Sequence, residues 1–136
     1  MLKCGITGAT GVLGKKIIKS LPFKFYQFKK DITKSNEVRD WVKKYKFDLI
    51  IHLAAITPVI EVKKNYKKAL KVNVIGTKNL VNSLLKKKDK PKWFFYASTS
   101  HVYKLNKKLK FTKENEVIKP QNFYGKTKLI AEKYLI

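Results

Sequence analysis

Residues 7–14 read TGATGVLG, and the fold follows from this stretch and its surroundings. Three glycines, Gly8, Gly11 and Gly14, stand three residues apart, directly after the apolar run 2–7. The apolar residues that follow, as far as Leu21, recur at helical spacing. Strand, glycine-rich turn and helix in this order are typical of a dinucleotide site, because glycines let the backbone approach a pyrophosphate at the positive end of the helix.

Segments with strand and helix patterns alternate along the rest of the chain. Further strands are predicted over 23–28, 48–55 and 92–97, and helices over 35–45 (capped by Ser35), 65–87 and 123–136. The run 48–55 is apolar without alternation, as in a strand that is buried on both faces of a parallel sheet. Gly76, within the second of these helices, indicates close packing against the sheet. The pattern predicts one α/β domain over residues 1–136, a Rossmann-like doubly wound parallel sheet of about four strands.

The charge is large but dispersed. The 136 residues include 32 basic and 9 acidic side chains, which give a formal net charge of +23. Arg39 is the only arginine, and the lysines are spread over the whole sequence, whereas nucleic-acid surfaces favour clustered arginines. We therefore expect no specific nucleic-acid partner, only non-specific attraction to polyanions at low salt.

Targeting and metal signals are missing from the sequence. No apolar run approaches the roughly 18 residues of a membrane-spanning helix, and glycines interrupt the N-terminal apolar stretch where a secretory signal would be continuous. A cytoplasmic location without a membrane partner is expected. The lone Cys4 is expected in the core, and no His, Cys, Asp or Glu residues have the spacing of metal ligands, so no metal site is expected.

Tyr124 and Lys128 are candidate catalytic residues. Four residues apart in a predicted helix, they share one face, where an ammonium would favour the phenolate and lower a pKa that is ordinarily about 10. Thr99 follows the fourth predicted strand, at the carboxyl edge where doubly wound sheets bind ligands. Ser98 or Ser100 would take its place if the loop is shifted by one residue. His52 is expected to be a hydrogen-bonded structural residue, and His101 is a weaker candidate for the substrate side.

Taken together, these stretches resemble the extended short-chain dehydrogenase/reductases, specifically the NAD-dependent epimerase/dehydratase family of nucleotide-sugar enzymes. The resemblance rests on the glycine stretch 7–14, on Asp31-Ile32-Thr33, on HLAA (52–55), on NVIGTKNL (73–80), on STSHVY (98–103) and on the Tyr124-x-x-x-Lys128 motif, which occur in the family's order.

The resemblance implies a role for each matching position. Thr99, Tyr124 and Lys128 would be catalytic, and Lys128 would also hold the nicotinamide ribose. The implied cofactor-binding residues are Gly8, Thr10, Gly11, Val12, Leu13, Gly14, Asp31, Ile32, Leu53, Ala54, Ala55, Asn73, Tyr124 and Lys128. The cofactor is NAD or NADP. Lys29 and Lys30 stand where an acidic residue would bind the 2′-hydroxyl of NAD, which favours NADP slightly.

The resemblance covers only the N-terminal part of such an enzyme. Family members continue for about as many residues again, so the C-terminal substrate domain is missing by comparison, and the apolar residues Leu129, Ile130, Tyr134, Leu135 and Ile136 have no predicted cover. The possible partners are therefore a homodimer mate, contacting residues 65–87 and 123–136, or a missing C-terminal half.

The implied substrate is a nucleotide-activated sugar. Thr99 is not followed by the Asp-Glu pair of sugar 4,6-dehydratases, and the compact segment up to Asp31 looks like the dTDP-4-dehydrorhamnose reductase branch. Reduction of a 4-keto-sugar with Tyr124 as acid/base is the first expectation. A nucleotide-sugar epimerase and a truncated cofactor-binding remnant without activity are the alternatives.

Overall fold

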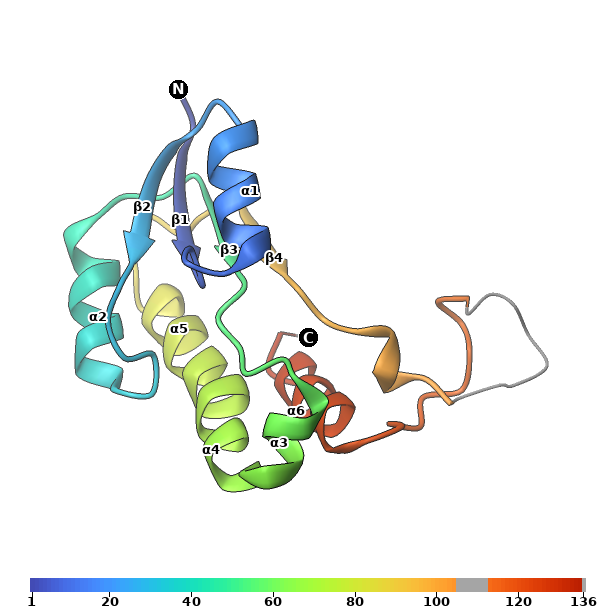
Figure 1. The fold of residues 1–136 in the computed structure, drawn as a ribbon. Coiled ribbons are helices and arrows are strands. Elements are labelled where there is room, and N and C mark those ends of the chain that lie inside the picture. The colour runs from blue at the N-terminus through green and yellow to red at the C-terminus, as the bar shows by residue number, and fades with distance from the viewer. Residues whose placement is uncertain (105–112, 136) are drawn as a thin grey trace.

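A computed structural model describes residues 1–104 and 113–135 and contains one sheet of four parallel strands (Figure 1). The strands are β1 (Lys3–Thr7), β2 (Lys24–Phe28), β3 (Leu49–His52) and β4 (Trp93–Tyr96), and their order across the sheet is β2-β1-β3-β4. Each lies inside a segment predicted from the sequence. The predicted doubly wound α/β fold is confirmed.

Helices cover both faces of the sheet, but unequally. Helix α1 (Val12–Ser20) packs on one face, and α2 (Ser35–Lys44) and α5 (Gly76–Leu85), which contact each other, pack on the other (Figure 1). Side chains of β2, β3, α2 and α5 form the larger core cluster, which includes Phe28, Trp41, Ile50 and Leu80. The smaller cluster lies beneath α1 and includes Cys4, which is fully buried as expected.

The predicted helix over 65–87 is found with an irregular beginning. It runs through α4 (Tyr66–Leu70), a π-helical turn η1 (Lys71–Ile75) and α5. Before it lies a short helix that the sequence did not reveal, α3 (Val59–Lys64), and Asn65 separates the two by accepting a hydrogen bond from the Lys68 N–H at 2.9 Å.

Two local expectations are wrong. Helix α2 begins at Ser35 itself, so its cap position is Lys34, which makes no side-chain cap bond. Gly76 packs against Ile32, in the loop after β2, rather than against the sheet, because a Cβ on Gly76 would lie 2.6 Å from Ile32 Cγ2.

The α1 face of the sheet is left partly open beside β4. There a hollow of about 580 Å³ lies between α1 and the strands, lined by Leu2, Ile17, Leu21, Phe23, Asp48, Leu49, Ile51, Lys92, Trp93 and Phe95. Trp93 is 72% exposed and Phe95 47% exposed. Parallel sheets are normally covered on both faces, so this part of the sheet lacks the cover that the opposite face has.

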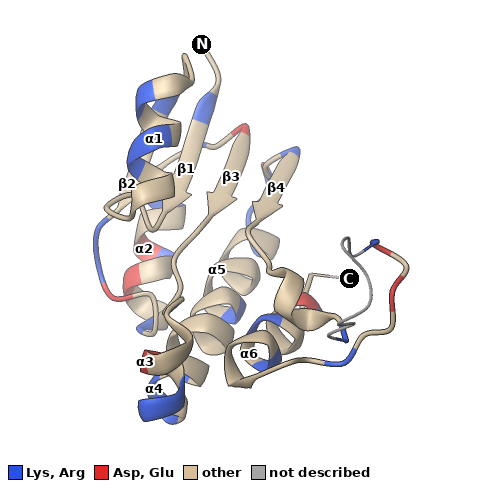
Figure 2. Ribbon diagram, turned by 45° about the vertical axis from the view of Figure 1, so that its right-hand side comes forward, with Lys and Arg blue, Asp and Glu red and all other residues tan. Residues whose placement is uncertain are grey.

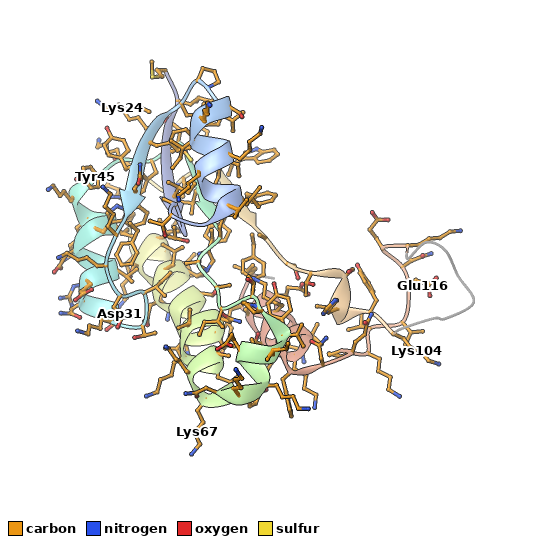
Figure 3. The ribbon with its side chains drawn as sticks, viewed as in Figure 1. Lys24, Asp31, Tyr45, Lys67, Lys104 and Glu116 are labelled. Atoms are coloured by element: carbon orange, nitrogen blue, oxygen red, sulfur yellow. The ribbon has the colours of Figure 1, made fainter. Side chains whose placement is uncertain are left out.

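After β4 the chain leaves the sheet and returns as α6 (Phe123–Glu132), which packs near α3 and α4 (Figure 1). The outgoing segment contains the 3₁₀ turn η2 (Ser100–Val102). An antiparallel bridge between Tyr103 and Ile118 pairs it with the returning segment. Figure 3 shows Lys104 and Glu116 on these two segments, away from the sheet. Helix α6 is shorter than predicted. Of the apolar residues predicted to lie uncovered, Tyr134 and Leu135 line a hollow against α5, and Ile136 falls outside the described residues.

Basic side chains are distributed over the fold without forming a single patch. Figure 2 shows Lys and Arg on helices of both faces, with few acidic residues among them. Within the described residues, no helix is long and apolar enough to cross a membrane.

Candidate cofactor-binding and active site

The candidate site lies where the direction of the chain connections reverses. β1 and β3 are neighbours, but the chain leaves β1 toward β2 on one side and leaves β3 toward β4 on the other. The strand pairing sets Thr7 beside His52, so the segments that follow these residues begin at the same carboxyl edge. Such a switch point is where open α/β sheets bind ligands.

The N-terminus of α1 forms one wall of the site. Gly11 is its cap residue, and the first intrahelical hydrogen bond runs from the Lys15 N–H to the Gly11 carbonyl at 3.0 Å. The backbone N–H groups of the first turn before Lys15 therefore have no partner within the helix. No acidic side chain lies in this turn. Free amides and the positive helix end together suit an anionic group.

The glycines shape this wall in different ways. Gly8 has a φ of +72°, which favours glycine, and a Cβ there would lie 2.7 Å from the Ala54 nitrogen. A Cβ on Gly14 would collide with the Gly8 carbonyl oxygen, so Gly14 lets the helix approach the turn. A Cβ on Gly11 would meet only that oxygen, at 3.4 Å, so Gly11 faces open space. The cradle therefore fits a pyrophosphate at Gly11.

A cleft of about 630 Å³ extends from this wall to α6. It brings together the predicted residues Gly8, Thr10, Gly11, Val12, Leu13, Gly14, Leu53, Ala54, Ala55, Tyr124 and Lys128. It is also lined by Thr57, Ala97 and Ser98, of which Thr57 and Ala97 were not singled out from the sequence. Thr57 follows the apolar run after β3 and carries no motif that distinguishes it. Residues from four separate parts of the sequence thus meet in one cleft.

A second hollow of about 450 Å³ adjoins the first and shares Gly8, Thr10 and Ala54 with it. It is lined at the end of β2 by Lys29, Lys30 and Ile32. Asp31 is exposed and does not line either hollow. Its carboxylate accepts hydrogen bonds from the Thr33 N–H at 2.9 Å and the Thr33 hydroxyl at 2.8 Å, which lower the pKa of Asp31. Figure 3 shows Asp31 in the loop beside α2.

His52 is a buried link between the strands and α5. The Thr77 hydroxyl donates to the Asn73 carbonyl at 2.7 Å, so its oxygen accepts from His52 Nε2 at 2.8 Å. His52 Nδ1 then accepts from the Thr7 hydroxyl at 2.6 Å, whose oxygen accepts the Ala54 N–H at 3.2 Å. Burial lowers the pKa of His52 to about 3. The expected structural role of His52 is confirmed.

The Asn73 side chain also makes its hydrogen bonds within the protein. It accepts a hydrogen bond from the Ile56 N–H at 2.8 Å and donates to the Ile56 carbonyl at 3.0 Å and to the Thr127 hydroxyl at 2.9 Å. Thr127 in turn donates to the Tyr124 carbonyl at 2.8 Å. Asn73 is 1% exposed and is not among the residues that line the cleft. In this structure it joins the segment after β3 to α6.

Tyr124 lies in the first turn of α6 because Asn122 caps that helix. Asn122 Oδ1 accepts from the Gly125 N–H at 2.9 Å, so its amide nitrogen, 2.9 Å from His101 Nδ1, is the donor in that contact. Gly125 also lies directly against the His101 carbonyl, which leaves no room for a Cβ. His101 is half-buried, with its ring edge-to-face on that of Tyr124 at a centroid distance of 6.0 Å. These contacts fix Tyr124 beside the turn after β4.

Lys128 lines the same cleft as Tyr124, and its ammonium lies over the ring of Tyr96. Its Nζ is 4.1 Å from the centroid of the Tyr96 ring. Burial lowers the pKa of Lys128 to about 8, against the opposing charge of Glu132. Burial raises the pKa of the Tyr124 hydroxyl. The Tyr124 pKa is thus raised by burial in this structure, not lowered by Lys128 as expected.

The hydroxyls of Ser98 and Thr99 are the two candidates for the substrate-binding role predicted for Thr99. Ser98 lines the cleft, but its hydroxyl hydrogen bonds to the Glu132 carboxylate. Thr99 does not line the cleft as described, and its oxygen accepts the His101 N–H at 3.3 Å as the cap of η2. Within residues 1–104 and 113–135, no three His, Cys, Asp or Glu residues are grouped so that they could hold a metal ion.

Comparison with known proteins agrees with this arrangement. Residues 2–136 match the family described as "RmlD substrate binding domain". A dTDP-4-dehydrorhamnose reductase of Aggregatibacter actinomycetemcomitans is 30% identical over 145 residues, which cover 100% of this chain and 47% of the relative. A dTDP-D-glucose 4,6-dehydratase of Dictyostelium discoideum is 33% identical over 126 residues, which cover 85% of this chain and 28% of the relative.

A solved structure shows the same architecture. The dTDP-4-dehydrorhamnose reductase of Bacillus anthracis, in complex with NADP, has a TM-score of 0.83 and 29% identity, covering 98% of this chain and 49% of that chain. The chain thus spans about half the length of the reductases that it matches. The resemblance seen in the sequence is confirmed: the chain belongs to the RmlD substrate binding domain family, among relatives of the nucleotide-sugar epimerases, dehydratases and reductases.

Proposed function

We propose that this chain is the cofactor-binding and catalytic portion of an NAD(P)-dependent oxidoreductase that acts on a nucleotide-activated sugar. One observation carries the proposal: a single cleft has the free amides of the α1 N-terminus at one end and Tyr124 with Lys128 at the other. The first end suits a pyrophosphate and the second suits proton transfer. The names of the relatives, reductases and dehydratases of dTDP-sugars, support this substrate class.

The reaction that we favour is reduction of a 4-keto-sugar. Because burial raises the pKa of Tyr124, its hydroxyl keeps its proton at neutral pH and is suited to donate it. A dehydratase is disfavoured although one relative bears that name, because Ser100 and His101 follow Thr99 where the resemblance leads us to expect an Asp-Glu pair in that enzyme class. One relative aligned over the whole chain is a dTDP-4-dehydrorhamnose reductase.

The nicotinamide, when bound, would supply the hydride. In this proposal the first-turn amides of α1 hold the pyrophosphate, and Gly11 leaves the space for it. Tyr124 donates its hydroxyl proton to the carbonyl oxygen that is being reduced, and the phenolate that remains recovers a proton from solvent. The Lys128 ammonium stabilises that phenolate. The Thr99 hydroxyl is assigned to the same substrate oxygen on the resemblance alone, because Thr99 is not among the residues that line the cleft.

The cofactor that we favour is NADP. Lys29 and Lys30 line the second hollow at the end of β2, where an ammonium would meet the 2′-phosphate. The Bacillus anthracis relative is in complex with NADP, which supports the same choice. Asp31 and Ile32 remain predicted neighbours of the adenine, Asp31 from outside the hollow and Ile32 from its lining.

Calorimetric titration of the folded chain with NADPH and NADH at physiological salt tests the cofactor half of the proposal. We expect saturable binding with tighter affinity for NADPH. A folded chain that binds neither dinucleotide would refute the proposed function.

Turnover is then tested with a dTDP-4-keto-6-deoxy sugar and NADPH, followed by absorbance at 340 nm, with Tyr124→Phe as the control. We expect loss of NADPH absorbance that depends on Tyr124. An epimerase would interconvert nucleotide-sugars without net NADPH consumption. Binding without either reaction would identify an inactive cofactor-binding remnant.

A further inference from the structure

The side chain of Lys128 is buried although it carries an ammonium group. It is 2% exposed, and among the lysines of the described residues it is the one that is buried. An ammonium removed from water loses its hydration, so the charged form persists only if other groups face it. Two groups act on it here: the ring of Tyr96, whose centroid lies 4.1 Å from Lys128 Nζ, and the negative charge of Glu132, which stands one helical turn further along α6 and acts on the ammonium without a direct ion pair.

Tyr96 acts on Lys128 through its ring. It is the last residue of β4, and its half-buried ring lies under the ammonium, in the geometry of a cation–π contact. The hydroxyl is buried and makes no hydrogen bond of ordinary geometry within the described residues. The contact with Lys128 is therefore made by the face of the ring.

Glu132 is itself held in place from the β4 side. Its carboxylate hydrogen bonds to the hydroxyl of Ser98, which lies two residues beyond Tyr96. The end of β4 and helix α6 are thus joined twice, once by the ring of Tyr96 under Lys128 and once by the hydrogen bond of Ser98 to Glu132. Lys128 and Glu132 are four residues apart in α6 and share one face of it.

The other titratable groups near Lys128 do not compensate its charge. His52, on β3, feels the ammonium as a repulsion and is held neutral by burial and its two hydrogen bonds. Tyr124, on α6 itself, is neutral because burial raises its pKa. Among the described residues, Glu132 is therefore the negative charge that acts on the ammonium.

We propose that Tyr96 and Glu132 are positioning residues, which hold the Lys128 side chain in its charged form against the wall of the cleft. The functional consequence of this inference rests on the proposed function, because the cofactor ribose and the Tyr124 phenolate would require a charged and fixed Lys128. The contacts themselves do not depend on that function.

The test is NMR titration of lysine-labelled protein, following the Lys128 side-chain signal, which Lys128→Arg identifies. We compare the wild type with Tyr96→Phe, Tyr96→Leu and Glu132→Gln. Tyr96→Phe keeps the ring and should leave the titration midpoint unchanged. Tyr96→Leu and Glu132→Gln should each lower it by about one pH unit, as expected for losing a desolvated cation–π contact or a neighbouring charge.

Tyr134→Leu is a matched control. Tyr134 lies in the turn after α6 and its ring also faces an ammonium, that of Lys78 at 5.2 Å, so the same substitution there should not move the Lys128 midpoint. An unchanged midpoint in Tyr96→Leu, or an equal shift in Tyr96→Phe, overturns the role of the ring. If Tyr96→Leu does not fold, Tyr96→Met removes the ring with a more flexible side chain, and an unchanged midpoint there overturns the role of the ring; Glu132→Gln decides the other half.

A parallel NADPH titration separates this inference from the proposed function. We expect affinity to fall in Tyr96→Leu and to be retained in Tyr96→Phe. Midpoint shifts in a chain that binds no dinucleotide would confirm the positioning contacts and reject the function. Normal dinucleotide binding with no midpoint shift would reject the positioning contacts alone.

Discussion

Replacing Gly11 with valine fills the floor of the cleft without disturbing the turn that forms it. Gly11 has an extended backbone, with φ −69° and ψ 166°, which valine adopts readily. A Cβ there meets only the Gly8 carbonyl oxygen at 3.4 Å, an ordinary contact. At the cap of a helix, exchanging glycine for a residue without a capping oxygen costs about 1 kcal/mol or less. The variant is expected to fold.

The effect on binding should be much larger than the effect on folding. The valine methyl groups would occupy the space from which a pyrophosphate reaches the first-turn amides of α1. Hydrogen bonds to a charged group contribute about 1.5–3 kcal/mol each. Losing two of them corresponds to about a 10²- to 10⁴-fold loss of affinity, at 1.4 kcal/mol for each factor of ten.

Calorimetry with NADPH on the wild type, Gly11→Val and Ser20→Val measures this difference. Ser20 is exposed at the far end of α1, so Ser20→Val adds the same side chain to the same helix away from the cleft. We expect the control to bind like the wild type. Wild-type affinity in Gly11→Val, with an unchanged thermal midpoint, would refute the assignment of the α1 N-terminus as the pyrophosphate site.

Three further predictions concern stability. Gly14→Ala should destabilise the fold by about 1–3 kcal/mol in urea unfolding, because its Cβ collides with the Gly8 carbonyl oxygen. The folded pKa of His52, about 3 against 6.5 unfolded, means that the unfolded chain binds a proton that the folded chain excludes. Stability should therefore fall with pH below 6.5, by about 2 kcal/mol between pH 7 and pH 5 from this residue. Thr127→Val should cost about 1–3 kcal/mol, because it leaves a buried N–H of Asn73 unpaired.

Each of these has a direct check. His52→Gln removes the titrating group, so its stability should be flatter than the wild type's over the same pH range, and equal slopes would contradict the pH argument. An unchanged urea midpoint in Gly14→Ala would mean that the turn yields to the added carbon. Thr127→Ser keeps both hydrogen bonds and should restore most of the loss, whereas no difference between the valine and serine variants would remove the hydrogen bond as the cause.

The strands and the main helices could be predicted because their apolar patterns are set by which faces are buried. The run 48–55 contains β3, and Ile50 and Ile51 are indeed buried on opposite faces. Helix α3 was missed because it is only six residues long and follows Pro58, so its sequence carries less than two turns of periodicity. The contact of Gly76 was assigned to the wrong partner because spacing shows that a glycine needs room, not which distant residue, here Ile32, takes it.

The candidate site was predictable where backbone geometry decides it. The glycine turn and the i, i+4 spacing of Tyr124 and Lys128 both place residues by local rules, and the cleft brings them together. The electrostatics were not predictable in the same way. The Tyr124 pKa depends on how far α6 is buried, and the direction of the Lys128 charge depends on Tyr96, which arrives from β4. No local pattern contains either contact.

The uncovered part of the α1 face has a spectroscopic consequence. The chain contains two tryptophans, of which Trp41 is 8% exposed in the larger core and Trp93 is 72% exposed on β4. Their emission should therefore separate into a blue component from Trp41 and a red component from Trp93, and only the red one is quenched by an aqueous quencher. Any polypeptide that covers this face would shift the red component to shorter wavelength, so the protein carries its own reporter for the occupation of that surface.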